Sequence, residues 1–150
     1  MSENKYKKLV EAGAVGLTIY QETYNMEIYK KMHIDGIKKD FKFRMNSPDR
    51  ALKAGFRKIN IGALLGLYNW KIEAAFLGLH ARYLIKKYWR ADIGVNFPRI
   101  KPSKSGFKPP YMVNDKNLVQ MIFALRIYLQ RANIAISTRE SAYFRDNMVG

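Results

Sequence analysis

Polar residues and glycines that could bind a ligand follow each of four short, β-branched segments. Glu22 follows the first, where its carboxylate could accept hydrogen bonds from ribose hydroxyls. Gly62 and Gly66 follow the second and would let a flat group such as a nucleobase approach the backbone. Arg99 follows the third, where a guanidinium suits a carboxylate, and Ser137 opens a donor-rich run after the fourth. Together these residues favour a polar ligand that carries a carboxylate and a ribose.

Each of these residues also has a structural alternative. Gly62 and Gly66 would relieve crowding between a strand and a helix, and Glu22 would cap the next helix or pair with a nearby base. Arg99 would do no more than hold the loop 101–112. The ligand hypothesis therefore depends on whether the ends of the four segments meet in one place.

The four segments have the composition of strands and lie far enough apart for crossover helices. They are residues 16–21, 58–63, 92–97 and 133–137. Parallel strands with right-handed crossovers form an open sheet or half of an eight-stranded barrel. We predict an α/β fold, a partial TIM-type (β/α) barrel of about four units, in one domain over residues 1–150.

Helix start and stop signals separate the predicted strands. A first helix runs from about Ser2 to Gly13, and a second has Ser47 as its N-cap, Pro48 next, and Gly55 as its stop. An apolar stripe predicts a helix over residues 70–89, and a further stripe follows the predicted N-cap Asn114. The two stripes are Trp70, Ala74, Leu77, Ala81, Leu84 and Tyr88, and Leu118, Ile122, Leu125 and Leu129.

A four-strand half barrel has two unpaired edges and one uncovered sheet face. We therefore expect this polypeptide to be part of a longer chain, incomplete at both ends.

Composition excludes several classes of site. The sequence has no cysteine, so the chain alone forms no disulfide, cysteine-ligated zinc site or iron–sulfur cluster. His33, predicted in a polar loop, and His80 lack partners at metal-ligand spacing, so we predict no metal site. Motifs of serine hydrolases, zincins, P-loop NTPases and dinucleotide-binding folds are missing. The charged N-terminus and the short apolar run 59–70 predict a cytoplasmic protein without a membrane span.

The net charge of +15 leaves a basic nucleic-acid-binding module as an alternative function. A phosphate-binding footprint requires clustered cations, and a lysine-rich solvated surface is the simpler interpretation. The densest cluster consists of Lys30, Lys31, Lys38, Lys39, Lys42 and Arg44.

An ordered set of motifs resembles the radical S-adenosylmethionine tyrosine lyases of thiamine thiazole synthesis, the 2-iminoacetate synthases. The resemblance covers nearly the whole chain, and the tyrosine lyases of hydrogenase maturation share its first and third motifs. The motifs are Tyr20-Gln21-Glu22-Thr23-Tyr24-Asn25, Ser47-Pro48-Asp49-Arg50, Ile61-Gly62-Ala63-Leu64-Leu65-Gly66-Leu67, Phe97-Pro98-Arg99-Ile100-Lys101-Pro102 and Ser137-Thr138-Arg139-Glu140-Ser141.

The resemblance implies a barrel enzyme that uses S-adenosylmethionine and a 4Fe–4S cluster held by a CxxxCxxC motif. The cluster cleaves S-adenosylmethionine to a radical, which breaks the Cα–Cβ bond of L-tyrosine to give 2-iminoacetate (dehydroglycine) and p-cresol. Implied partners are a cysteine-bearing N-terminal segment and the thiazole synthase that uses 2-iminoacetate, with neither membrane nor nucleic acid. Because the family's cluster cysteines precede the matching region, we expect an interior to C-terminal piece that is inactive alone.

The resemblance also assigns roles by position. Glu22 looks like the ligand of the ribose hydroxyls, and Arg44 like the base that binds the methionyl carboxylate of S-adenosylmethionine. Arg99 is assigned to the tyrosine carboxylate and Ser137 to a supporting donor, while no residue is assigned a catalytic role.

The glycine-rich segment resembles the family's GxIxGxxE motif. Its implied backbone platform near the adenine consists of Gly62, Leu64 and Gly66, with Asn69 in place of the family's Glu. A chain that does not fold remains a further alternative. If the likeness holds, Glu22, Arg44 and Arg99 should point toward one common pocket.

Overall fold

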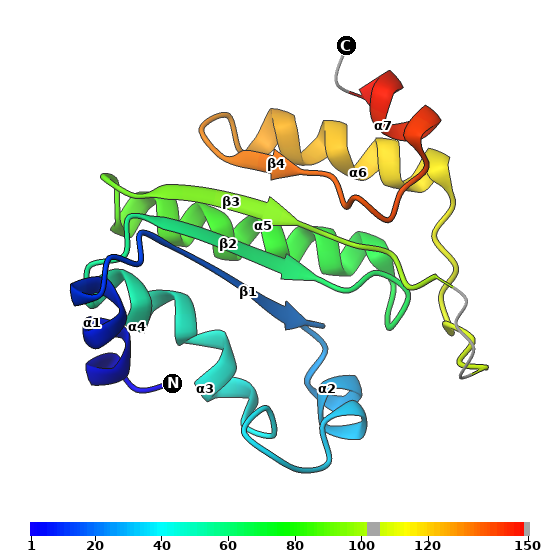
Figure 1. The fold of residues 1–150 in the computed structure, drawn as a ribbon. Coiled ribbons are helices and arrows are strands. Elements are labelled where there is room, and N and C mark those ends of the chain that lie inside the picture. The colour runs from blue at the N-terminus through cyan, green and yellow to red at the C-terminus, as the bar shows by residue number, and fades with distance from the viewer. Residues whose placement is uncertain (102–105, 149–150) are drawn as a thin grey trace.

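The computed structural model describes residues 1–101 and 106–148. Four parallel strands form one sheet in sequence order, as predicted (Figure 1). They are β1 (Gly16–Glu22), β2 (Lys58–Ala63), β3 (Asp92–Asn96) and β4 (Asn133–Ala135). β1 ends one residue later than predicted and β2 has the predicted bounds, whereas β3 and β4 end one and two residues earlier than predicted.

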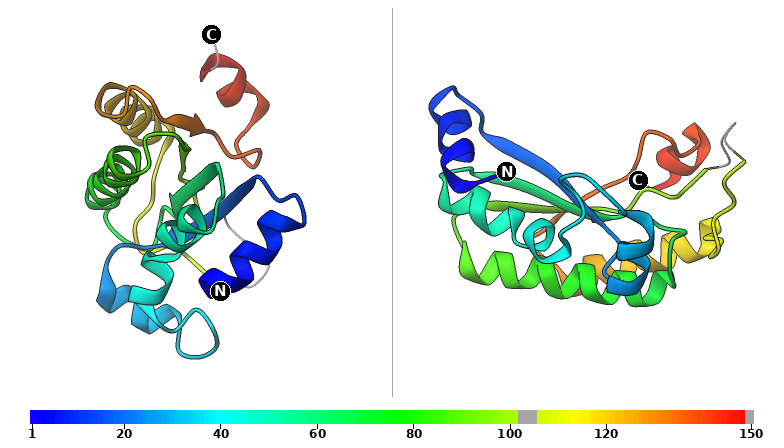
Figure 2. Two further views of the ribbon diagram at one scale, coloured as in Figure 1. Left: turned by 90° about the vertical axis from the view of Figure 1, so that its left-hand side faces the viewer. Right: turned by 90° about the horizontal axis from the view of Figure 1, so that it is seen from below.

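Helices connect the strands and lie in an arc around the outside of the curved sheet (Figure 2). They are α1 (Glu3–Glu11), α2 (Met26–Met32), α3 (Phe41–Met45), α4 (Ser47–Lys53), α5 (Trp70–Lys87), α6 (Asp115–Tyr128) and α7 (Ala142–Met148). No helix in the described part of the chain is long and apolar enough to cross a membrane. The arrangement of strands and outer helices is that of consecutive units of a β/α barrel.

The helix ends confirm two predicted boundaries and correct a third. Asn114 caps α6 through a reciprocal capping box with Asn117. Gly13, with a φ of 95°, follows the end of α1. Ser47, however, is not an N-cap: the cap is Asn46, because α3 ends immediately before α4. The Ser47 hydroxyl instead donates to the carbonyl oxygen of Phe43 at 3.2 Å.

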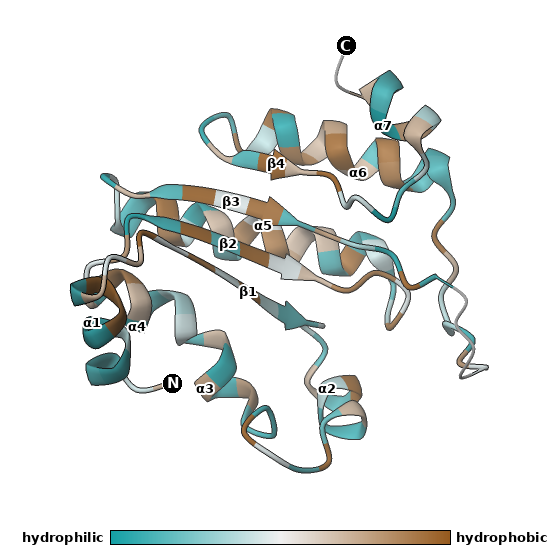
Figure 3. Cartoon of the chain, in the orientation of Figure 1, coloured by the Kyte–Doolittle hydropathy of each residue, from teal (hydrophilic) through white to brown (hydrophobic). Residues whose placement is uncertain are grey.

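Alternation along the strands separates a buried face from a polar one. Ile59 and Ile61 of β2 and Val95 of β3 belong to the core that α5 and α6 cover. The opposite face carries polar residues such as Thr18 and Asn60, and the views in Figures 2 and 3 show no helix lying across it within the described residues. The uncovered face expected for a half barrel is thus observed, and it is polar.

Two glycines on the polar face make room for larger neighbours. A side chain at Gly62 would collide with the Tyr20 ring and the Asn96 carbonyl oxygen, and one at Gly94 with the Asn60 amide. Both glycines therefore allow side chains from adjacent strands to lie across the sheet.

Candidate functional site

Glu22 lies at the C-terminal end of β1 in an unusual backbone conformation. Its φ is 73°, and the register of β1 against β2 shifts between Tyr20 and Glu22. A non-glycine residue with positive φ is uncommon and is retained where surrounding contacts enforce it. The Leu64 N–H donates to the Glu22 carbonyl oxygen at 2.7 Å and holds the end of β1 against the loop after β2.

Two cations lie near the Glu22 carboxylate. Lys38 Nζ is 3.1 Å and Arg44 Nη2 is 3.7 Å from Glu22 Oε1, while Arg44 Nε donates to the Tyr20 carbonyl oxygen at 2.8 Å. We call Glu22, Lys38 and Arg44 the Glu22 cluster. Because the Arg44 contact is long and one partner is an exposed lysine, the Glu22 carboxylate can exchange these partners for a ligand.

A buried carboxylate from α5 fixes the turn that follows Glu22. Glu73 is 1% exposed and accepts hydrogen bonds from the Thr23 hydroxyl and, at 2.9 Å, from the Tyr24 N–H. Burial raises the pKa of Glu73, although these hydrogen bonds oppose that effect. Its position on the buried face of α5 was the available sequence signal, since a carboxylate there requires partners.

A second contact joins the same turn to α5. The Tyr24 hydroxyl is hydrogen-bonded to His80 Nδ1 at 3.0 Å, and both side chains are buried. Burial lowers the pKa of His80 to about 4 and raises that of Tyr24, so both groups are neutral at pH 7. His33, predicted in a loop, follows the end of α2 and stacks on Tyr29. The described residues form no cluster of three or more metal-ligating side chains.

Arg99 is the centre of a more enclosed group of charges, formed with Lys101, Asp115 and Glu140, which we call the Arg99 cluster. Its guanidinium binds both oxygens of Glu140, with Nε 3.0 Å from Oε1. Nη1 contacts Asp115 Oδ1 at 2.7 Å and the Val113 carbonyl oxygen at 3.1 Å. Arg99 is 8% and Glu140 4% exposed. The guanidinium therefore directs most of its donors into the protein.

Glu140, in the turn after β4, binds both Arg99 and Lys101 in the loop after β3. Burial would raise its pKa, but hydrogen bonds from Arg99 and from Lys101, whose Nζ is 2.9 Å from Oε2, lower it overall. The cluster ties the loop after β3 to the turn after β4. The structural alternative for Arg99 is thus observed for the described part of loop 101–112, of which residues 102–105 lie outside the description.

A cavity of about 410 Å³ opens at the C-terminal edge of the sheet, between the two clusters. Its lining includes Glu22, the apolar side chains of Leu64 and Leu67, and the cations Lys101 and Arg139. Parallel α/β folds bind ligands at this edge. The cavity combines a carboxylate, an apolar wall and positive charge, which suits a ligand with hydroxyl, flat apolar and carboxylate parts.

The predicted site residues occupy different positions around this cavity. Glu22 and Leu64 line it, and Arg44 lies beside Glu22. Gly66, with a φ of 117°, packs against Pro109 and Ile100. Gly62 lies under the Tyr20 ring, so both glycines relieve crowding, although against side chains of neighbouring strands and loops rather than a helix.

The turn after β4 contributes a residue that sequence reasoning passed over. Ser137 Oγ accepts from the Arg139 N–H at 3.2 Å, and the Glu140 N–H donates to the Ser137 carbonyl oxygen at 3.0 Å. This turn places Arg139, rather than Ser137, in the lining of the cavity. The signal available in the sequence was the basic residue within the Ser-Thr-Arg-Glu-Ser motif.

The basic cluster identified in the sequence is spread over α2, α3 and their connection. Lys38 and Arg44 face Glu22, and Lys30 lies 3.8 Å from Glu27 on α2. Three members of the cluster thus have carboxylates beside them. This pairing reduces the positive charge that a nucleic-acid backbone would encounter.

Comparisons with known proteins support a single relationship along the chain. Residues 96–150 match the family described as Biotin and Thiamin Synthesis associated domain. Two curated relatives are named 2-iminoacetate synthase, from Salmonella typhimurium (39% identical over 150 residues) and Escherichia coli (37% over 150 residues). Each match covers 99% of this chain and 40% of the relative. The chain thus spans about 40% of the length of these relatives.

Solved structures show the same arrangement of strands and helices. The FeFe-hydrogenase maturase HydG from Carboxydothermus hydrogenoformans is 36% identical with a TM-score of 0.92, covering 99% of this chain and 35% of that chain. A second HydG structure is 31% identical with a TM-score of 0.89, and the match covers 99% of this chain and 34% of that chain. Methylornithine synthase (PylB) is 23% identical with a TM-score of 0.59, and the match covers 95% of this chain and 47% of that chain. At this identity the likeness shows the fold alone. These matches confirm the predicted partial barrel and the resemblance found in the sequence.

Proposed function

Proceeding from its homology along the whole chain to 2-iminoacetate synthases, we propose that this polypeptide is part of a radical S-adenosylmethionine tyrosine lyase. The complete barrel cleaves the Cα–Cβ bond of L-tyrosine to 2-iminoacetate and p-cresol, and a thiazole synthase uses the 2-iminoacetate. The supporting observation is the cavity at the sheet edge, with Glu22 on one side and Arg139 and Lys101 among its lining residues.

The residues around the cavity fit S-adenosylmethionine, whereas the cluster ligands lie elsewhere. The chain has no cysteine, so a CxxxCxxC segment in another part of the enzyme holds the 4Fe–4S cluster. When bound to that cluster, S-adenosylmethionine supplies the radical that removes a hydrogen atom from tyrosine. The segment described here binds and orients the two ligands and excludes water.

Two residues of the Glu22 cluster are proposed to hold S-adenosylmethionine. Glu22 accepts hydrogen bonds from the ribose hydroxyls, and Arg44, fixed through Nε by Tyr20, binds the methionyl carboxylate. Leu64 and Leu67 provide an apolar wall for the adenine. The platform predicted at Gly62 and Gly66 acts through the backbone, since neighbouring atoms fill the space above both glycines.

The tyrosine carboxylate needs a cation that is not already engaged. Most Arg99 donors are bound to Glu140, Asp115 and Val113. Arg139 and Lys101 line the cavity, and Arg139 has no ion pair among the described residues. We therefore assign carboxylate binding to Arg139, while Arg99 and Ser137 hold the loops around it.

Reconstitution of the complete enzyme tests this function. The chain is combined with the remaining segments of a 2-iminoacetate synthase, including the cysteine-bearing N-terminal segment, loaded with cluster and assayed anaerobically for p-cresol. The second product, 2-iminoacetate, is measured as glycine after borohydride reduction. We expect both products from the combined segments, and failure with a fully loaded cluster would contradict the proposal.

A matched pair of variants locates the site. Glu22→Gln removes the charge that binds the ribose hydroxyls, and we expect at least about a tenfold loss of p-cresol formation. Glu27→Gln, on the exposed face of α2, removes a carboxylate that pairs with Lys30 alone among the described residues, and it should leave the rate unchanged. Equal activity of both variants would remove Glu22 from the site.

A further inference from the structure

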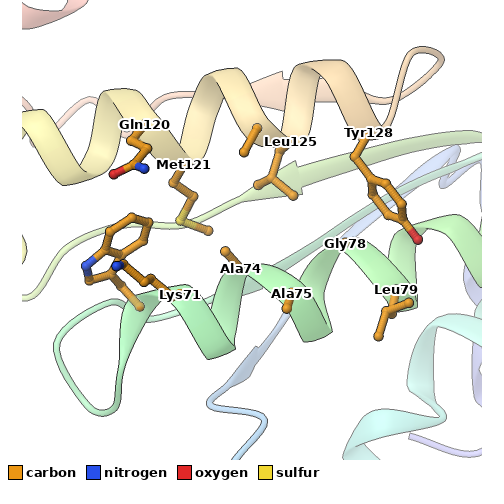
Figure 4. Close-up of a pocket in the computed structure, with 11 residues that line it drawn as sticks. Lys71, Ala74, Ala75, Gly78, Leu79, Gln120, Met121, Leu125 and Tyr128 are labelled. Carbon is orange, nitrogen blue, oxygen red and sulfur yellow. The ribbon is translucent and has the colours of Figure 1, made fainter.

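A groove between α5 and α6 lies on the outer surface, away from the site proposed above (Figure 4). The residues that face each other across it are small, with Ala74 and Gly78 on α5 and Ala124 on α6, and the groove encloses about 560 Å³. A methyl group at Gly78 would lie 3.3 Å from atoms of Leu125 and Tyr128. The small residues thus bring the helices together and still leave a hollow between them.

The borders of the groove are apolar and exposed. Leu79 on α5 is 56% exposed and Tyr128 on α6 is 40% exposed, and both line the groove. The lining itself is almost entirely apolar and extends from the end marked by Lys71 to the end marked by Tyr128 (Figure 4). A contiguous exposed apolar surface of this kind marks an interaction site, because leaving it in water is unfavourable.

The charge around the groove has one sign. The exposed cations of α5 and α6 outside ion pairs of the described residues are Lys71, Arg82, Lys86, Lys116 and Arg126. The two helices contain only two carboxylates, of which Glu73 is buried and Asp115 is bound to Arg99. Lys71 lines one end of the groove, and Arg82 donates to the Tyr128 hydroxyl at 3.2 Å at the other. Carboxylates of a partner would therefore meet cations at both ends.

We infer that this groove binds an acidic amphipathic helix of another protein. A trough between two packed helices accepts the apolar stripe of a third, with anchors at i, i+3 or i+4, and i+7. The lining residues of α5 run from Trp70 to Leu79, which corresponds to about 14 Å or two and a half helical turns. The partner's apolar side chains fill the hollow, and its flanking carboxylates pair with Lys71 and Arg82.

Two other occupants fit the surface less well. A second copy of the chain would bring +15 against +15 and would offer helices that are themselves rich in lysine. A membrane surface contacts projecting apolar side chains, whereas here the apolar surface is hollowed between two helices. Charge and shape together favour the acidic helix.

Binding of labelled synthetic peptides to the full chain tests the inference. The probe is a helical peptide with a leucine stripe and glutamate flanks. One comparison peptide carries lysine flanks, and another has the same composition in scrambled order. Fluorescence anisotropy should show that both comparison peptides bind at least about tenfold more weakly than the probe.

Groove variants separate specific binding from attraction to a basic protein. The double variant Leu79→Gln with Ala124→Gln keeps the charge but makes the groove polar, and it should lower affinity for the probe about tenfold. Ile37→Gln, at a residue that is 88% exposed on the connection between α2 and α3, is the matched control and should bind normally. Circular dichroism checks that each variant is folded.

Several outcomes would overturn the inference. Unchanged probe affinity in the folded double variant would show that the groove is not the site. A stronger effect of Lys8→Gln on α1 than of Lys71→Gln would indicate general electrostatic attraction. Groove-dependent binding to phosphatidylserine vesicles, or a dimer in sedimentation that the double variant abolishes, would replace the acidic helix with a membrane or a second copy.

Discussion

The two charged clusters at the sheet edge contain the same chemical groups in contrasting environments. The Arg99 cluster joins a guanidinium to both oxygens of a carboxylate, and both partners are buried. In the Glu22 cluster the guanidinium is 3.7 Å from the carboxylate, which also lines the cavity. The comparison shows that an arginine at a strand end can be structural, and we propose the more loosely paired carboxylate of Glu22 as the ligand-binding group.

The largest expected effect comes from removing the buried carboxylate of the Arg99 cluster. Glu140→Gln removes the buried negative charge that pairs with Arg99 and Lys101 and leaves one acceptor oxygen in place of two, and we expect a loss of about 3–5 kcal/mol in the free energy of unfolding. Urea unfolding measures this loss. Asp115→Asn, whose side chain is 70% exposed, is the control and should cost less than about 1 kcal/mol. Similar losses in both variants would contradict the structural role of Glu140.

Acid should destabilise the folded chain through His80, which is hydrogen-bonded to Tyr24 in the turn after β1. The pKa of His80 falls from 6.5 to about 4 on folding, so below pH 6.5 the unfolded chain binds more protons than the folded chain. Stability is therefore lost as the pH falls from 6.5 toward 4, by about 3 kcal/mol in total. In His80→Gln this part of the pH dependence should vanish from unfolding free energies, whereas the control His33→Gln should retain it.

A smaller loss is expected when the turn after β1 loses its anchor. Glu73→Gln replaces a carboxylate that accepts from Thr23 and Tyr24 with an amide that has one acceptor oxygen. We expect a loss of about 1–3 kcal/mol in the free energy of unfolding. Glu27→Gln serves again as the exposed control. If Glu73 positions Glu22, p-cresol formation in the reconstituted enzyme should fall even at low temperature without denaturant, where the variant is fully folded.

The smallest effect on stability is expected at Glu22 itself. Glu22→Gln breaks contacts with an exposed lysine and a distant arginine, so the free energy of unfolding should change by less than about 1 kcal/mol. A loss comparable with that of Glu140→Gln would mean that the two clusters have the same role. The difference between the Glu22 cluster and the Arg99 cluster would then give no reason to assign ligand binding to Glu22.

Much of the fold was predictable because its signals are local. Period-two alternation, glycines after helices and the Asn114 cap determine where elements begin and end, and the order of the strands follows from crossover length. The segment between β1 and α4 was harder. Its short helices α2 and α3 have little apolar periodicity. Because α3 ends directly before α4, the N-cap of α4 is Asn46 rather than the predicted Ser47.

The site was predictable in its location and less so in its roles. Glu22 and Leu64 line the cavity as expected from strand-end positions. The engagement of Arg99 depends on Glu140, 41 residues later in the sequence, and no local pattern reports that contact. Glu73 and Arg139 were likewise missed because their significance depends on what the folded chain places beside them.

The glycines of the polar sheet face determine how much space remains inside the half barrel. The Tyr20 ring occupies the space over Gly62 and the Asn60 amide the space over Gly94, so each side chain lies across the neighbouring strand. An alanine at either glycine would push the aromatic ring or the amide away from the sheet and toward the interior of the barrel.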